Sequence, residues 1–234
     1  MVNLPIGGFQ KQGLIDYPGH IASIVYTCGC NFRCSYCHNP ELVLPKLIAK
    51  SAKLKSDEIL RWIAKNKIML DAIVITGGEP TLHGSLPDFI KQIKSLGLKV
   101  KLDTNGTNSL MLHQLISHNL VDYVAMDIKA PLNFEKYKEI VGNKLTNKLF
   151  KELIYSIEIL QKNSINFEFR TTLDSKLKID DIIEITNQVT GKLYFQKLHF
   201  NDKFIQKQKT RLSNSELEQL VAKCNDQLSI QIRE

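Results

Sequence analysis

The sequence lacks the features that mark membrane-spanning, secreted or nucleic-acid-binding proteins. No run reaches the ~18 consecutive apolar residues needed to cross a bilayer, and residues 1–12 contain neither the basic nor the apolar segment of a secretory signal. Arginine-rich stripes with interleaved aromatic residues are also missing, so the net charge of +7 predicts a solvated face. We therefore expect a cytoplasmic protein that binds no membrane and no nucleic acid.

The chain also lacks internal repeats, low-complexity tracts and any linker that would divide it. Its 234 residues, of which 43% are hydrophobic and 24% charged, suffice for one sizeable core. We expect a single domain over residues 1–234, with its motifs between about residues 20 and 200 and a last helix near 213–224.

Cysteine is scarce but concentrated. Four of the five cysteines lie between Cys28 and Cys37, which is too crowded for a disulfide framework and indicates metal ligands. The fifth, Cys224, shares an apolar helix face with Leu217, Leu220 and Val221, and we expect it in the core.

Apolar, β-branched runs alternate with amphipathic helical patterns along the chain. The runs predict six strands, near residues 21–27, 72–76, 98–102, 121–126, 165–172 and 193–198. Helices are expected between them, including one that begins with Ser56 as its N-cap. Repeated βα units imply a parallel sheet, and six strands are too few for a closed eight-stranded barrel. The fold expected is α/β, a partial, open (β/α)6 barrel.

The most informative motif directly follows the first of these strands. Cys30, Cys34 and Cys37 form a CxxxCxxC pattern, and three thiolates on one short loop suit a [4Fe–4S] cluster whose fourth iron stays open. The alternative is a zinc site completed by Cys28 or His38. A cluster is favoured because zinc sites usually use a second, distant cysteine pair, which this chain lacks.

Polar groups follow three further strands. These are Gly77-Gly78-Glu79-Pro80, Asp103-Thr104-Asn105-Gly106 and Asp127-Ile128-Lys129. Parallel barrels build their sites at this end of the strands. Glu79, with Lys129 or Arg170, offers the acceptor and donors that a zwitterionic amino acid moiety needs. His83, by contrast, is expected to be solvated.

These motifs resemble those of the radical S-adenosylmethionine (SAM) activating enzymes of glycyl radical enzymes, including a tyrosine, Tyr36, before the last cluster cysteine. The resemblance extends from about residue 7 to 200, and several stretches are most similar to the short anaerobic ribonucleoside-triphosphate reductase activating proteins. These stretches are Gly8-Phe-Gln-Lys, Leu14-Ile-Asp-Tyr-Pro-Gly, Cys37-His-Asn-Pro-Glu, Ile75-Thr-Gly-Gly-Glu-Pro-Thr, Val124-Ala-Met-Asp-Ile-Lys-Ala-Pro and Phe167-Glu-Phe-Arg-Thr-Thr.

The resemblance implies an enzyme whose chemistry is carried by a cluster and SAM rather than by a catalytic side chain. Cys30, Cys34 and Cys37 would hold the [4Fe–4S] cluster, and SAM would chelate its open iron. Reductive cleavage of SAM would give a 5′-deoxyadenosyl radical that abstracts hydrogen from a glycine of a partner enzyme. The residues implied around SAM are Tyr36, His38, Gly78, Glu79, Asp103, Asn105, Asp127, Lys129, Arg170 and His199.

The partner implied is a glycyl radical enzyme, with anaerobic ribonucleotide reductase favoured, and the electrons would come from a low-potential donor such as flavodoxin or ferredoxin. An activase of the pyruvate formate-lyase type and a small-molecule radical SAM enzyme are alternatives with the same chemistry. A chain with little beyond the barrel leaves the mouth of the site open, which suits a protein loop better than a small substrate that needs a lid. A zinc-stabilised binding module is the alternative from another class.

Overall fold

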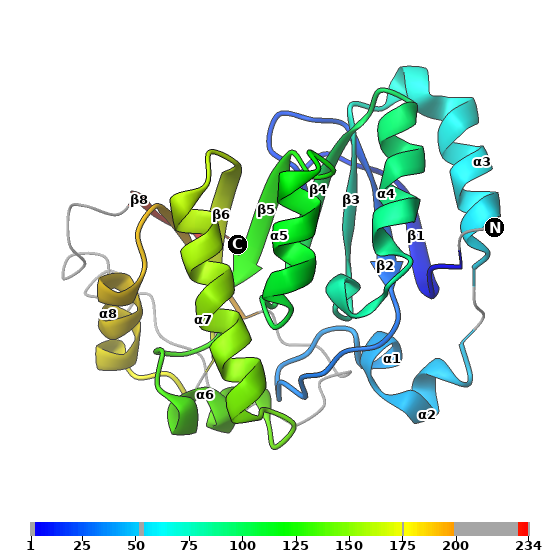
Figure 1. The fold of residues 1–234 in the computed structure, drawn as a ribbon. Helices are drawn as coiled ribbons and strands as arrows, with labels where there is room; N and C mark the ends of the chain where they lie inside the picture. The colour runs from blue at the N-terminus through cyan, green and yellow to red at the C-terminus, as the bar shows by residue number, and fades with distance from the viewer. Residues whose placement is uncertain (1–2, 52–53, 175, 199–228, 234) are drawn as a thin grey trace. The chain divides into compact units, whose positions relative to one another are not determined.

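The computed structural model describes residues 3–51, 54–174, 176–198 and 229–233, which form helices and strands in alternation (Figure 1). The chain divides into two compact units that are described separately. The first contains residues 1–30, 41–104 and 108–125, and the second contains residues 31–40, 105–107 and 126–234. Strand β5 (Tyr123–Asp127) runs from the first unit into the second.

The first unit is built on four paired strands. Its elements are β1 (Ile6–Gly13), β2 (Ala22–Thr27), α1 (Pro40–Val43, whose first residue belongs to the second unit), α2 (Pro45–Ile48), α3 (Ser56–Asn66), η1 (Lys67–Met69), β3 (Ala72–Gly77), η2 (Pro80–Leu82), α4 (Leu86–Ser95), β4 (Lys99–Thr104) and α5 (Ser109–Ser117). β2, β3 and β4 are parallel, with Ala22 opposite Ala72 and Ala72 opposite Lys99. β1 pairs with β2 in the antiparallel direction.

The longer helices of this unit, α3, α4 and α5, each bury apolar residues. Phe89, Ile90 and Ile93 of α4 are fully buried, because residues three and four apart share a face of a helix. α4 packs against β4, and α3 lies beside α4 (Figure 1). The parallel strands β2 and β3 are apolar along most of their length, as expected for strands buried on both faces.

The second unit continues the same alternation. Its elements are α6 (Phe134–Val141), α7 (Asn147–Lys162), β6 (Asn166–Leu173), α8 (Ile179–Gln188), β7 (Lys192–Lys197) and β8 (Ser229–Arg233). β6, β7 and β8 are parallel neighbours. Leu153, Ile157 and Leu160 form the buried face of α7.

The predicted alternation is confirmed, since the six predicted strands correspond to β2 through β7 and the α/β fold class holds. Two strands were missed. β1 was missed because it begins within an N-terminal stretch rich in residues typical of turns, among them Gly7 and Gly8. Gly7 is required there, since a Cβ at that position would collide with the side chains of Leu42 and Cys28. The other missed strand is β8, near the end of the chain. The helix predicted near 213–224 lies outside the described residues.

The predicted N-cap of α3 was wrong. Lys55 occupies that position, and Ser56 is the first helical residue. The hydroxyl of Ser56 is buried, donates to the carbonyl of Leu4 at 2.9 Å and accepts from its amide at 3.0 Å. Ser56 therefore ties the N-terminal segment to the helix instead of capping the helix.

Candidate functional site

In the first unit, the loop that leads to Cys30 lies against the Gly77-Gly78 turn. The amide of Gly78 donates to the carbonyl of Thr27 at 2.8 Å, and the amide of Glu79 donates to the carbonyl of Gly29 at 2.7 Å. A Cβ at Gly78 would collide with the backbone of Gly29, so only glycine permits this approach. In the structure this glycine lets two backbone segments of the first unit meet.

Glu79 is almost fully buried, with 1% of its surface exposed. Its Oε1 accepts hydrogen bonds from the amide and hydroxyl of Thr81, at 3.1 and 2.6 Å, and from the hydroxyl of Thr104, at 2.7 Å. Hydrogen bonds to a carboxylate stabilise its charged form. The two threonines therefore orient a buried acceptor, and neither was singled out from the sequence.

We expect Thr104→Val to lower the free energy of unfolding by about 2 kcal/mol, because it removes a buried hydrogen bond to a charged group while keeping the side-chain shape. Urea denaturation of the cofactor-free chain measures this. The matched control is Thr190→Val, since Thr190 is exposed and its hydroxyl accepts only from the neutral Gln161 amide at 2.7 Å among the contacts described. An equal loss of unfolding free energy in both variants would show that the hydrogen bond from Thr104 to Glu79 contributes no more stability than an exposed neutral one.

The next motif begins at the end of β4 and makes both local contacts and contacts with distant residues. The side chain of Lys101 donates to Asp103 at 2.6 Å, and both side chains are largely buried. In the second unit, Asn105 donates to Asn31 at 2.9 Å and accepts from the amide and hydroxyl of Thr107, at 3.0 and 2.6 Å. Asn105 therefore joins its own loop to Asn31, the residue after Cys30.

The second unit gathers five of the predicted site residues. Asp127 accepts from the ammonium of Lys129 at 2.9 Å and from Nε of Arg170 at 3.0 Å, so one carboxylate joins two cations. The Lys129 ammonium also lies 5.7 Å from the centre of the Tyr36 ring, within the range of a cation–π contact. The remaining member of the group is Cys34, which interacts electrostatically with Lys129 and Asp127.

The charges of this group act on one another. Burial raises the pKa of Cys34 to about 11, while the Lys129 ammonium opposes the shift. Burial on its own would lower the pKa of Lys129, but Asp127 and an ionised Cys34 outweigh it and raise that pKa. Lys129 therefore stays protonated, so the group keeps a fixed positive charge beside Cys34.

Tyr137 completes this arrangement and was missed. Its hydroxyl accepts from the backbone amide of Lys129 at 3.0 Å, and the ring is fully buried. Tyr137 lies in α6, which the sequence analysis did not predict. The available signal was Asn133, which caps the helix by accepting from the amide of Lys136 at 3.1 Å.

The remaining predicted residues are placed as follows. Cys30 belongs to the first unit, whereas Cys34, Cys37 and the exposed His38 belong to the second. Within the described part of the chain, no group of three or more His, Cys, Asp or Glu side chains converges on a single metal ion. The ligands of a cubane cluster bind separate irons and need not converge in this way. His199, like Cys224, lies outside the described residues.

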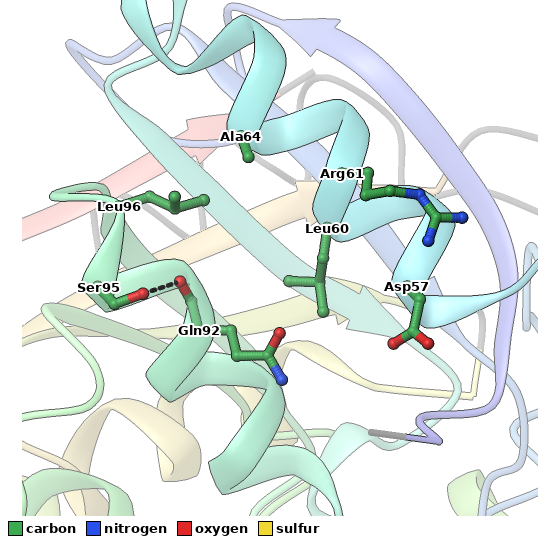
Figure 2. Close-up of a pocket in the computed structure, with 7 residues that line it drawn as sticks. All are labelled: Asp57, Leu60, Arg61, Ala64, Gln92, Ser95 and Leu96. Carbon is green, nitrogen blue, oxygen red and sulfur yellow. Dashed lines mark hydrogen bonds between the residues drawn. The ribbon is translucent and has the colours of Figure 1, made fainter. Parts of the chain in front are cut away.

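A pocket of 350 Å³ lies on the first unit between α3 and α4 (Figure 2). Leu60 and Leu96 provide its apolar part, and Asp57, Arg61 and Gln92 are the polar residues around it (Figure 2). None of the residues predicted to bind a cluster or SAM lines this pocket. This pocket is therefore not the candidate site.

No helix in the described ranges is both long and apolar enough to cross a membrane.

The family is decided by a match between residues 24–189 and the model of the Radical SAM superfamily. This chain belongs to the Radical SAM superfamily. The match includes the cysteine motif and the strand-end residues up to Arg170. The partial-barrel fold of this superfamily and its requirement for a [4Fe–4S] cluster and SAM therefore hold for the chain.

Two curated relatives and one solved structure agree with this assignment. The chain is 36% identical, over 76% of its length, to a Methanocaldococcus jannaschii protein named as a glycyl-radical enzyme activating enzyme. It is 33% identical, over 61% of its length, to the pyruvate formate-lyase-activating enzyme of Clostridium pasteurianum. The crystal structure of Streptococcus suis SuiB bound to S-adenosylmethionine matches 90% of the chain with a TM-score of 0.64 at 13% identity, which supports the fold alone.

The chain spans only part of these proteins. It covers 72% of the first relative, 59% of the second and 49% of the SuiB chain. Their whole activities and partners therefore do not transfer directly to this chain.

The side chains present fit the superfamily cofactors in their chemistry. Cys30, Cys34 and Cys37 form no disulfide, and thiolates are the ligands of iron–sulfur clusters. A bound iron requires the thiolate form of Cys34, which burial disfavours and the Lys129 ammonium partly restores. In the second unit, the cations around Asp127 have the charge that a carboxylate group requires. In the first unit, the buried Glu79 carboxylate has the charge that an ammonium group requires.

Proposed function

We propose that Cys30, Cys34 and Cys37 hold a [4Fe–4S] cluster and that the chain generates a glycyl radical on a partner protein. The observation that carries this proposal is the group formed by Cys34, Asp127, Lys129 and Arg170, because it sets fixed positive charge beside a cluster cysteine. The family match covers residues of both units, which supports a single radical SAM domain over residues 1–234.

When bound, the reduced cluster supplies the electron that cleaves SAM to methionine and a 5′-deoxyadenosyl radical. The chain's own residues bind and orient SAM. Lys129 and Arg170 offer donors for its carboxylate, and Glu79 offers an acceptor for its amino group. Tyr36 presents a buried ring next to Lys129. His38, Gly78, Asp103, Asn105 and His199 complete the proposed set around SAM.

We propose anaerobic ribonucleoside-triphosphate reductase as the partner. The support is the similarity of the quoted sequence stretches to the short activating proteins of that enzyme. A relative named as a pyruvate formate-lyase-activating enzyme favours a second candidate, an enzyme of the pyruvate formate-lyase type. A low-potential donor such as flavodoxin or ferredoxin would reduce the cluster. The free cysteines suit a reducing compartment such as the cytoplasm.

The test of this proposal combines the reduced, cluster-loaded chain with SAM and each candidate partner. Chromatography measures 5′-deoxyadenosine, and electron paramagnetic resonance measures the radical left on the partner. Formation of both with one partner supports an activase and identifies the target. A small-molecule enzyme would give 5′-deoxyadenosine only with its metabolite and would leave no protein radical.

A further inference from the structure

The backbone that leads to Cys30 is held by a series of hydrogen bonds within the first unit. Four of them join backbone groups: Thr27 O to Gly78 N (2.8 Å), Cys28 N to Pro5 O (2.8 Å), Gly29 N to Leu42 O (2.7 Å) and Gly29 O to Glu79 N (2.7 Å). The partners come from three separate stretches of the chain, at Pro5, at Leu42 and at Gly78-Glu79. This segment is therefore fixed from several sides immediately before the first predicted cluster ligand.

The carbonyl of Cys28 is bound by a side chain. Nε2 of His83 lies 2.8 Å from this oxygen, and Cε1 of the same ring lies 3.8 Å from the position of a Cβ built on Gly29. His83 caps the end of η2, on the same loop as Glu79. The prediction that His83 is solvated was therefore wrong, because its ring is half-buried against the cysteine loop.

The contact specifies the state of the ring. A carbonyl oxygen only accepts, so Nε2 must carry the proton. Burial lowers the pKa of His83, although the bond to Cys28 opposes the shift, and a lowered pKa agrees with a neutral ring at neutral pH. A neutral donor on a short loop can hold a backbone carbonyl without bringing a charge to the cluster.

We propose that His83 is a positioning residue, which holds the Cys28 carbonyl and thereby fixes the backbone from which Cys30 reaches the cluster. The inference rests on the proposed cluster ligands and adds a residue outside that set. Cys30 is two residues beyond the held carbonyl, so loss of the bond would free the backbone next to a ligand. We expect the cluster to bind but to be released more readily.

The experiment measures how fast the reconstituted chain loses its cluster to an iron chelator under anaerobic conditions, from the decay of cluster absorbance. His83→Phe keeps a ring but removes the donor, and His83→Gln keeps an N–H near the position of Nε2. Loss of a side chain that hydrogen-bonds a metal ligand commonly weakens metal binding tenfold or more. Loss of a neutral hydrogen bond to the backbone near a ligand should weaken it less. We therefore expect release about three to ten times faster in His83→Phe and close to the wild-type rate in His83→Gln.

The matched control is His118→Ala, because His118 is exposed and its ring also bonds a backbone carbonyl, that of Gln114, at 2.8 Å. It should release the cluster at the wild-type rate. Urea denaturation of each cofactor-free variant separates a local effect from general loss of stability, and electron paramagnetic resonance of the reduced cluster reports its surroundings.

Wild-type release from His83→Phe, or equally fast release from His83→Phe and His83→Gln, would overturn the positioning role while leaving the proposed function intact. Faster release that simply follows a loss of folding stability in all three variants would overturn it too. A wild-type chain that binds no cluster would contradict the proposed function itself, and the inference would fall with it.

Discussion

Cys34→Ala is expected to abolish cluster binding. The anaerobically reconstituted wild-type chain should bind about four irons and four sulfides, and a three-cysteine site that loses one thiolate cannot retain the cubane. Cys34 is buried and interacts electrostatically with Lys129. Iron and sulfide analysis together with the absorbance spectrum measures the effect.

The control for this prediction is Cys224→Ala, because Cys224 was assigned to a helix core from its sequence pattern. It should bind the full cluster. A full cluster in Cys34→Ala would show that the ligands lie elsewhere. A colourless wild-type chain that binds one zinc ion instead would favour the binding-module alternative.

Lys129→Met is expected to weaken SAM binding by tenfold or more while the cluster is retained. The substitution removes the ammonium but keeps a long, unbranched side chain over Tyr36. Hydrogen bonds to charged groups contribute about 1.5–3 kcal/mol, and 1.4 kcal/mol corresponds to a tenfold change in affinity. Glu79→Gln should have an effect in the same direction, since it removes the negative charge proposed to face the amino group of SAM.

Lys162→Met is the matched control for Lys129→Met. Lys162 is also paired with a carboxylate, that of Glu158 at 3.1 Å, but both side chains are exposed. Such surface pairs contribute little, so SAM affinity should be unchanged. Equilibrium binding of SAM to the cluster-loaded chains measures all three variants. Unchanged affinity in both Lys129→Met and Glu79→Gln would place the SAM pocket elsewhere.

Local patterns were enough to predict the repeated βα units and the motifs at the ends of the strands. β2 and β3 are apolar and β-branched, and each ends at a polar motif, so their pattern specifies both the strand and its functional end. Asp127, Lys129 and Arg170 were placed in one set around SAM by the family resemblance. In the structure these three side chains form ion pairs within the second unit.

What could not be predicted depends on contacts between distant segments. In β1, the side chains of Leu42 and Cys28 occupy the space that a Cβ at Gly7 would fill, and only the structure shows this contact. His83 was predicted to be solvated because the carbonyl that it contacts, that of Cys28, is 55 residues away in the chain. Tyr137 supports Lys129 from a short helix. These contacts join residues far apart in the sequence, so no periodic pattern of residues predicts them.

Electron paramagnetic resonance of the partner tests most directly whether this chain generates a protein radical, as proposed. Dithionite-reduced, cluster-loaded chain, SAM and the anaerobic ribonucleotide reductase of the same genome are combined without oxygen, and 5′-deoxyadenosine is measured in parallel. We predict a glycyl radical doublet that rises in step with 5′-deoxyadenosine and is absent when Cys34→Ala replaces the wild-type chain. Release of 5′-deoxyadenosine without a doublet on this reductase or on a pyruvate formate-lyase-type enzyme would contradict the claim.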